Sequence, residues 1–239
     1  MPEERLQRAL ARAGYGSRRA CEALIVAGRV KVGGVVATLG DKVPGPGNDI
    51  QVDGVTVNVD PQVRYYALNK PAGVLTTMRD PGGRTDITGL LPEGPRVFPV
   101  GRLDRDTEGL LLLTNDGDLA NRLTHPKFGV EKEYLAEVSA RPTRTQLAQI
   151  RAGVELDDGP ARAKTVRLVA NSGERAAIRL VMTEGRKREV RRLLAAVGLP
   201  VTRLVRLRVG PVRLGNLPAG QFRPLTREEL VELERSSGE

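Results

Sequence analysis

The hydrophobic pattern of the first fifty residues predicts two helices followed by short strands. Apolar residues recur every three or four positions over residues 4–14 and again over residues 17–28, where Ser17 is a suitable N-cap for the second helix. Residues 29–38 read as a hairpin around a Gly-Gly turn, and residues 49–58 read as a second pair of short strands. These elements are expected to form a small compact module.

We expect this module to occupy residues 1–60, with a linker around Asp60 and Pro61, and a second domain to occupy residues 61–239. In the second domain, apolar or alternating runs bounded by turn residues predict strands at 64–70, 109–114, 133–138, 163–169 and 176–182. Helical patterns are found at 118–125, 143–153 and 185–198. Because strands and helices do not alternate regularly, the pattern favours an α+β fold over a doubly wound parallel sheet.

The helix expected over residues 185–198 has two chemically different faces. Its apolar residues fall at i, i+3, i+4 and i+7, so one face is expected to be buried. They are Val190, Leu193, Leu194 and Val197. The opposite face carries Lys187, Arg188, Arg191 and Arg192.

The charge balance favours a polyanionic partner. The chain has 38 Lys and Arg against 29 Asp and Glu, a net charge of +9. The excess is concentrated, because residues 1–31 hold seven basic and three acidic side chains and residues 186–213 hold nine basic side chains and one acid. A solvated surface would explain the total charge, but two separated basic segments favour two contact surfaces on one long nucleic acid.

Composition argues against several other classes. The single cysteine, Cys21, leaves no disulfide framework and no cysteine cluster for a metal. No apolar run approaches the length of a membrane span, and the first residues lack a signal-peptide core, so we expect a soluble cytoplasmic protein. The only histidine, His125, has no obvious nucleophile partner for a Ser-His-Asp triad, and Gly-rich nucleotide-binding motifs are absent.

The segment of greatest chemical interest is GRLDRDTEGLLLLTNDGDLANRL, residues 101–123. A charged loop containing Asp104 and Asp106 leads directly into an apolar strand. A carboxylate at the end of a buried strand can be desolvated on one side and held rigidly, as a nucleophile or general base requires. From the pattern alone, either aspartate could instead cap a turn or pair with Arg102 or Arg105.

Four segments, in order, resemble the motifs of pseudouridine synthases of the RsuA family. They are NKPAGVLTT (69–77), GRLDRDTEGLLLLTNDG (101–117), EKEYLAEV (131–138) and EGRKREVRRLLAAVG (184–198). Residues 3–50 resemble an S4 RNA-binding domain, which is found at the N-terminus of these enzymes. The resemblance covers nearly the whole chain and implies a catalytic domain with a mainly antiparallel mixed sheet flanked by helices.

The resemblance implies that Asp104 is the catalytic aspartate. Pseudouridine formation breaks the N1–C1′ glycosidic bond of a uridine, turns the uracil and rejoins it to the sugar through C5. Asp104 would either attack C1′ or abstract the 2′ proton to give a glycal intermediate. Neither route requires a metal or another cofactor, and none is expected.

The resemblance also assigns roles to Tyr134 and Arg191. Tyr134 matches the active-site tyrosine, on which a flipped uracil could stack and whose phenol could help to move the C5 proton. An ordinary strand tyrosine is the alternative. Arg191 matches the basic residue that pairs with the catalytic aspartate. A phosphate contact or a solvated helix face is the alternative for Arg191.

Other basic residues are expected to contact RNA. Arg102 is similar to a residue that enters the helix vacated by the flipped nucleotide, although a salt bridge to a neighbouring aspartate is equally open. Lys70 could contact a phosphate or stabilise the sheet edge, and Arg188 and Arg192 are candidates beside Arg191. The RNA-facing surface of the S4-like module would consist of Arg5, Arg8, Arg12, Arg18, Arg19 and Arg29.

The sequence is therefore interpreted as a monomeric enzyme that isomerises a specific uridine in ribosomal RNA, in the large subunit (23S). Small-subunit (16S) rRNA is the main alternative substrate. A non-catalytic rRNA-binding or ribosome-assembly factor of the same fold would fit the basic surfaces equally well. Such a factor would not need Asp104, Tyr134 and Arg191 together.

Overall fold

The computed structural model describes residues 3–44, 49–57, 62–172 and 175–237. The chain forms two compact units. The first contains the residues up to Arg64 together with Glu93–Val97, and the second contains Tyr65–Pro92 and Phe98–Glu239. The linker expected around Asp60 and Pro61 lies outside the described residues.

The segment Glu93–Val97 differs from the division expected from the sequence, which placed it in the second domain. In the structure it belongs to the first unit. The guanidinium of Arg96 donates a hydrogen bond to the main-chain carbonyl of Gly16, and this contact joins the segment to the N-terminal unit.

Two helices and short strands make up the N-terminal unit. Helix α1 spans Leu6–Arg12 and α2 spans Arg18–Val26. Ser17 caps α2 as expected, because its hydroxyl accepts a hydrogen bond from the N–H of Ala20 at 3.2 Å. One sheet has the order β3-β2-β5-β6, with bounds Val35–Val36, Val30–Val32, Ile50–Val52 and Val55–Thr56. A separate antiparallel pair, β1 (Glu3–Arg5) and β4 (Lys42–Pro44), was not expected.

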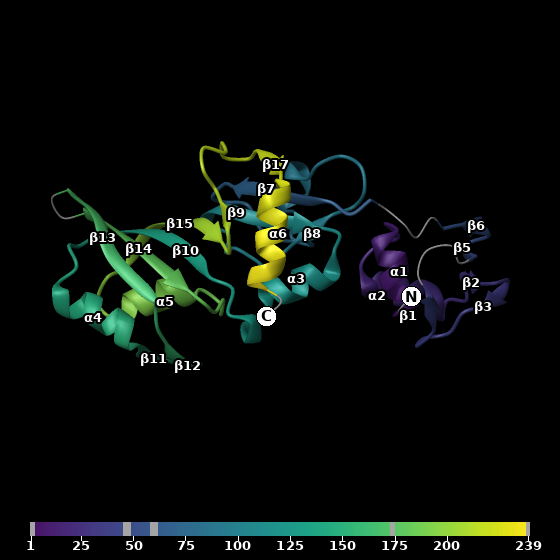
Figure 1. The fold of residues 1–239 in the computed structure, drawn as a ribbon, viewed down its shortest axis with the longest axis horizontal. Helices are drawn as coiled ribbons and strands as arrows, with labels where there is room; N and C mark the ends of the chain where they lie inside the picture. Colours follow the sequence, from purple (N-terminus) through teal and green to yellow (C-terminus); the bar gives the residue numbers. More distant parts are fainter. Residues whose placement is uncertain (1–2, 45–48, 58–61, 173–174, 238–239) are drawn as a thin grey trace. The chain divides into compact units, whose positions relative to one another are not determined.

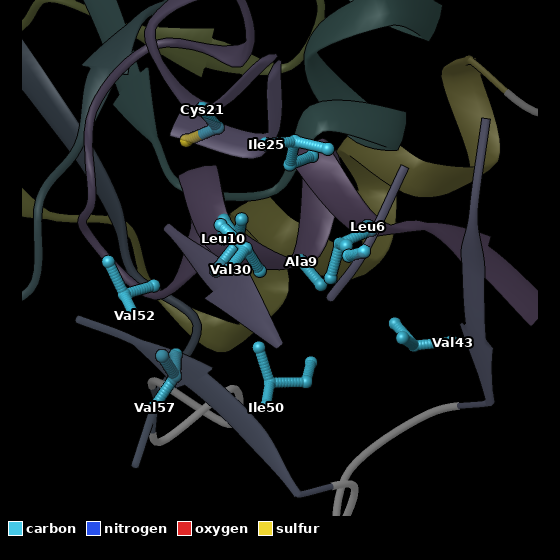
Figure 2. Packing of buried hydrophobic residues seen from close by; sticks show 11 residues of the cluster. Leu6, Ala9, Leu10, Cys21, Ile25, Val30, Val43, Ile50, Val52 and Val57 are labelled. Carbon is cyan, nitrogen blue, oxygen red and sulfur yellow. The ribbon is translucent and has the colours of Figure 1, made fainter. Parts of the chain in front are cut away.

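A hydrophobic core joins these helices to the sheet. Leu6 and Leu10 of α1 and Ile25 of α2 are buried in one cluster with Val30 and Ile50 of the strands (Figure 2). Burial of a large apolar side chain contributes about 1.5–3 kcal/mol. The apolar residues at helical spacing therefore supply the core.

The second unit contains a mixed sheet of nine strands among its described residues (Figure 1). The main order is β13-β14-β10-β15-β9-β7-β17, and β16 and β8 pair with β15 and β9. The bounds in chain order are β7 Tyr65–Lys70, β8 Phe98–Pro99, β9 Thr107–Thr114, β10 Lys132–Val138, β13 Thr165–Ser172, β14 Arg175–Met182, β15 Val201–Val209, β16 Val212–Arg213 and β17 Phe222–Pro224. Among the strand pairs that the structure describes in this sheet, only β15 and β9 are parallel, so the sheet is mainly antiparallel as expected. A separate hairpin consists of β11 (Val154–Leu156) and β12 (Gly159–Ala161).

Helices flank both ends of this sheet in the described part of the second unit. They are α3 (Gly117–Thr124), α4 (Arg144–Ala152), α5 (Glu189–Ala196) and α6 (Arg227–Ser236), with short 3-10 turns at Ile87–Leu90 and Pro126–Phe128. Helix α4 contacts β13, and α5 contacts β15 and β11 (Figure 1). Leu119 of α3 and Leu233 of α6 share a buried cluster with Leu110 of β9. No helix in the described residues is long and apolar enough to cross a membrane.

Several elements of this unit differ from the sequence expectation, among them the short strands β8, β11, β12, β16 and β17, which were not predicted. Strand β15 was not predicted, because arginines interrupt its apolar pattern and a bulge shifts its register against β10. Helix α6 was not predicted either, although a capping box at Thr226 begins it. Helix α5 begins at Glu189 and not at residue 185, because Arg188 has left-handed backbone angles (φ 51°) and ends the preceding turn.

Candidate active site

A pocket of about 240 Å³ lies on the sheet face between α3 and α5. Leu123 of α3 and Val190 of α5 line its sides, and Tyr134 of β10 and Arg206 of β15 line its base. The loop before β9 contributes Asp104. The volume is below the range of about 300–1,000 Å³ that is usual for drug-sized ligands, so the pocket suits a single small group such as one nucleobase.

Asp104 is held by main-chain contacts on both sides. The hydroxyl of Thr76 accepts a hydrogen bond from the N–H of Leu103 at 3.2 Å and donates one to the carbonyl of Leu103 at 2.8 Å. The carbonyl of Asp104 accepts a hydrogen bond from the N–H of Thr107 at 3.0 Å, which closes a turn. The Asp104 side chain is half-buried and lines the pocket. Its backbone is therefore fixed where the loop enters β9.

Gly109 makes the close approach of β9 to β15 possible. Its φ is +99°, and a Cβ atom at this position would lie 2.3 Å from the carbonyl oxygen of Arg206. Only glycine adopts this conformation without strain and leaves room for the neighbouring backbone. The residue thus places the loop of Asp104 beside β15.

Lys70 corrects one sequence expectation. Its side chain is fully buried, and its ammonium donates hydrogen bonds to the carbonyls of Pro71 (2.9 Å), Val74 (2.7 Å) and Arg105 (3.2 Å). A phosphate contact is therefore excluded by burial, and the lysine instead joins the loop after β7 to the loop of Asp104. Burial lowers the pKa of Lys70 to about 8, against the opposing effect of Asp106, Asp104 and Glu108.

Tyr134 lies in the base of the pocket. Its side chain is 8% exposed, and in the sheet it lies opposite Leu180 of β14 and Arg206 of β15. Tyr134 and Asp104, which are thirty residues apart in the chain, line the same pocket.

The side chain of Arg191 contacts the main chain of the loop that carries Asp104. The guanidinium donates hydrogen bonds to the carbonyls of Asp106 (3.0 Å) and Val201 (3.1 Å), and no ion pair joins it to Asp104 in the described structure. Burial and the positive charge of Arg188 lower the pKa of Arg191, while Asp104 and Asp106 act in the opposite direction. Its Nε is buried without a hydrogen-bond partner. The structure thus places the arginine beside the aspartate without the direct pairing expected from the sequence.

The remaining basic residues predicted to contact RNA fall into different settings. Arg102 and Arg188 are exposed and line the pocket, and no salt bridge joins Arg102 to Asp104 or Asp106 in the described residues. Arg192 lies outside the pocket lining and pairs with the carboxylate of Asp158 at 2.8 Å.

In the N-terminal unit, some of the predicted arginines are already engaged within the protein. Arg5 donates a hydrogen bond to the Gly40 carbonyl at 2.6 Å, and Arg12 pairs with Glu4. Arg18 and Arg19, at the start of α2, are exposed. These last two are the better placed of the four to meet a ligand.

Two cationic residues of the pocket were missed by the sequence reasoning. Lys132 of β10 and Arg206 of β15 both line it, and the Arg206 side chain is buried at 4% exposure. Burial and the positive charge of Arg206 lower the pKa of Lys132 to about 8, while Glu189 acts in the opposite direction. Lys132 precedes Tyr134 by two positions, so the alternation of a strand would have placed both on one face. Arg206 had no comparable signal, because β15 itself was not predicted.

Arg186 shapes the wall of the pocket and was also missed. Its guanidinium pairs with the buried carboxylate of Glu189 at 3.2 Å and with Asp158 at 3.0 Å. It also donates hydrogen bonds to the carbonyls of Gly159 and Pro160 in the β11–β12 hairpin. These contacts hold the turn before α5 in place.

Comparison with known proteins identifies the class of this protein. Residues 64–196 match the RNA pseudouridylate synthase family, and residues 4–50 match the S4 domain. The uncharacterized RNA pseudouridine synthase of Mycobacterium leprae is 47% identical over 98% of this chain and 93% of its own length. The ribosomal large subunit pseudouridine synthase B of Salmonella typhi is 46% identical over 93% of this chain and 79% of its own length.

A solved structure agrees with this classification. The crystal structure of a pseudouridylate synthase superposes with a TM-score of 0.67 at 29% identity, covering 96% of this chain and 99% of that one. The chain belongs to the RNA pseudouridylate synthase family. It is an enzyme that acts on RNA, with an S4 domain before the catalytic unit.

Proposed function

We propose that this enzyme isomerises one specific uridine of large-subunit ribosomal RNA, with Asp104 as the catalytic residue. The observation that carries the catalytic assignment is the meeting of Asp104 and Tyr134 in one small pocket. Large-subunit rRNA is supported by 46% identity to the ribosomal large subunit pseudouridine synthase B of Salmonella typhi. We further propose that the enzyme acts as a monomer in the cytoplasm.

The proposed chemistry begins with a uridine turned out of its RNA helix into the pocket. The uracil stacks on Tyr134 while the carboxylate of Asp104 faces the sugar. Asp104 either attacks C1′, forming an ester as the N1–C1′ bond breaks, or removes the 2′ proton, forming a glycal as the same bond breaks. In both routes the electron pair of the broken bond stays on the uracil, which turns and forms a bond from C5 to C1′. In the first route the ester bond between Asp104 and C1′ breaks in this step and the carboxylate leaves. In the second route the proton held by Asp104 returns to C2′ as C5 bonds to C1′. The C5 proton is then lost and N1 gains a proton.

Positively charged residues support this reaction in two ways. Arg191, through its hydrogen bond to the carbonyl of Asp106, positions the loop that carries Asp104. Arg102 and Arg188, exposed in the pocket lining, are suited to contact the RNA around the flipped nucleotide. Arg192 is proposed to contact a phosphate beside them. For this contact, its ion pair with Asp158 must open, or its guanidinium must bind Asp158 and the phosphate together.

The S4 domain is proposed to hold structured RNA through its exposed arginines. Arg18 and Arg19 are the main candidates, and Arg5 and Arg12 extend the basic surface beside them. Phosphate contacts of this kind add affinity and register without reading sequence.

The test is a map of pseudouridines in the rRNA of cells with and without the gene. We expect one site to be lost from large-subunit rRNA and to return with the wild-type gene but not with Asp104→Asn. If the lost site lies in 16S rRNA, the substrate is small-subunit rRNA and not large-subunit rRNA. An unchanged map in both subunits would refute rRNA modification.

A further inference from the structure

Three polar groups in the base of the pocket are not used by the mechanism above. They are Thr107 on β9, Lys132 on β10 and Arg206 on β15, and all three line the pocket with Asp104. The strands that carry them are neighbours, because β15 lies between β10 and β9 in the sheet. Two cationic side chains and a hydroxyl therefore lie on neighbouring strands that line the same pocket.

Arg206 is the most unusual of the three. Arg206 is only 4% exposed, yet among the described residues its guanidinium makes a single hydrogen bond, from Nε to the carbonyl of Leu110 at 2.7 Å. None of the ion pairs among the described residues includes Arg206. Because a buried charge without a counter-charge is costly, its retention beside a pocket indicates a ligand with acceptor atoms.

Lys132 and Thr107 also have hydrogen-bond donors that the described part of the protein does not fully use. The ammonium of Lys132 donates a hydrogen bond to the carbonyl of Val130 at 3.0 Å, while Arg206 repels it. The hydroxyl of Thr107 is buried and has no hydrogen-bond partner among the described residues. All three groups therefore have hydrogen-bonding capacity that the described residues leave unused, and all three residues line the pocket.

The register of the sheet places these groups beside the tyrosine. Arg206 lies directly opposite Tyr134 across the β10–β15 pair, and Lys132 is two residues before Tyr134 on the same face. Side chains directly opposite in an antiparallel pair have Cβ atoms about 4.5–5.5 Å apart. A base stacked on Tyr134 would therefore present its edge to both cations.

We propose that Lys132 and Arg206, with the Thr107 hydroxyl as a third donor, bind the carbonyl oxygens of the flipped uracil and stabilise its negative charge after the glycosidic bond breaks. This inference rests on the proposed function. When the N1–C1′ electron pair stays on the uracil, the charge spreads from N1 to O2, O4 and C5. Donors fixed around the carbonyl oxygens stabilise this anion more than the neutral base, and they hold it while it turns. No other reactant is needed, and both routes for Asp104 produce the same anion.

The first test measures the chemical step separately from RNA binding. The substrate is rRNA from cells that lack the gene, carrying tritium at C5 of its uridines, so that each isomerisation releases one tritium. We expect Lys132→Gln to slow single-turnover release by about 100-fold while RNA affinity stays within about twofold. Lys132→Arg should stay within about tenfold of the wild type, because it keeps a cation at this position.

Two further variants distinguish a loss of catalysis from a loss of stability: the first is a control and the second tests the third donor. Lys164→Gln removes an exposed lysine that pairs with Glu131 outside the pocket, and it should leave the rate unchanged. Thr107→Val removes a hydroxyl that has no partner among the described residues, so it should slow tritium release without lowering the melting temperature. A Thr107→Val enzyme with full activity would argue against the third donor.

The pH profile tests the need for a cation at residue 132. The charged groups that face Lys132 are Arg206 from β15 and Glu189 from α5, with Asp104 and the basic turn 186–188 on the pocket wall. Because the pKa of Lys132 is about 8, the wild-type rate should fall as the pH rises through 8. Lys132→Arg stays protonated and should keep its rate to higher pH. An equal fall in both enzymes would overturn the inference.

A substrate whose uracil anion is a better leaving group distinguishes a catalytic role of Lys132 from a purely structural one. Fluorine at C5 stabilises the uracil anion, so consumption of 5-fluorouridine in the same RNA should suffer less from Lys132→Gln than consumption of uridine does. A purely structural residue would give the same defect on both substrates. Loss of RNA affinity in place of rate would indicate a phosphate contact and would also contradict the proposal.

The outcomes separate this inference from the proposed function. A wild-type enzyme that releases no tritium from any rRNA would refute the proposed function, and the inference with it. A wild-type enzyme that is active while Lys132→Gln retains the full rate would refute the inference alone.

Discussion

The buried ammonium of Lys70 donates a hydrogen bond to the carbonyl of Arg105, the residue that follows Asp104. The same ammonium binds the carbonyls of Pro71 and Val74. The guanidinium of Arg105 in turn donates to the carbonyl of Gly73, and the N–H of Gly73 donates to the carbonyl of Arg105. These hydrogen bonds join the loop after β7 to the loop that carries Asp104. Their acceptors are main-chain carbonyls, which every residue has.

Substitution of Lys70 by methionine should therefore destabilise the second unit. It leaves three carbonyls near the buried ammonium without their donor, and each lost buried hydrogen bond costs about 1–3 kcal/mol. We expect a loss of about 2–4 kcal/mol in the free energy of unfolding, measured by urea denaturation. Lys164→Met, at an exposed position, should change it by less than about 0.5 kcal/mol.

Lys70 also makes a pH-dependent contribution with a definite sign. Its pKa is lowered by burial to about 8 in the folded protein, from an ordinary value of 10.5. Between these two values the unfolded chain binds more protons than the folded one, so the contribution of this group to stability increases with pH. The stability difference between wild type and Lys70→Met should therefore grow from pH 8 to pH 10. A difference that stays constant over this range would contradict the assignment.

Asp104→Asn should abolish pseudouridine formation and leave RNA affinity close to that of the wild type. The amide keeps the size of the side chain but can neither attack C1′ nor accept the 2′ proton. We expect a loss of at least about 10⁴-fold in single-turnover tritium release. Asp106→Asn, two residues away and outside the pocket lining, is the matched control and should keep its rate within about threefold. A normal rate in Asp104→Asn would refute the catalytic assignment.

Tyr134→Phe and Tyr134→Leu separate the ring of Tyr134 from its hydroxyl. Stacking of a base on an aromatic ring is worth about 1–3 kcal/mol. Leucine should therefore reduce single-turnover isomerisation by about 10–100-fold, while phenylalanine keeps the stacking surface. A large defect in the phenylalanine variant would show that the phenol moves the C5 proton. Melting temperatures of both variants report whether the buried position tolerates the change.

Gly109→Ala should be among the most destabilising single substitutions in the catalytic unit. The added Cβ would lie 2.3 Å from the carbonyl oxygen of Arg206, at a φ of +99°. We expect a loss of more than about 3 kcal/mol, or failure to fold, as measured by urea denaturation. Gly215→Ala is the control, because its φ of +58° is also left-handed but no atom lies within 4 Å of the added Cβ. It should cost only about 1–2 kcal/mol.

The periodic elements of this protein could be predicted because their own residues specify them. Helix α2 begins after Ser17, whose hydroxyl caps it, and its apolar residues repeat at helical spacing. Strand β9 contains the apolar run 110–113, which is buried within the sheet. Asp104 could not be singled out in this way, because the pattern left both Asp104 and Asp106 as candidates before this strand; the resemblance to the RsuA family assigned the catalytic role to Asp104.

The sequence by itself thus determined the fold class, the enzyme family and the carboxylate at the centre of the proposed site. Only the tertiary structure decided that Lys70 is buried and joins two loops by hydrogen bonds. It also decided that Arg191 donates a hydrogen bond to the carbonyl of Asp106, and that Lys132 and Arg206 both line the base of the pocket. The physical reason is that these roles depend on hydrogen bonds and strand pairing between residues about 35–85 positions apart in the chain. A lysine or arginine has the same charge and length in every setting, so its neighbours across the sheet decide whether it binds a phosphate, a carbonyl or a substrate.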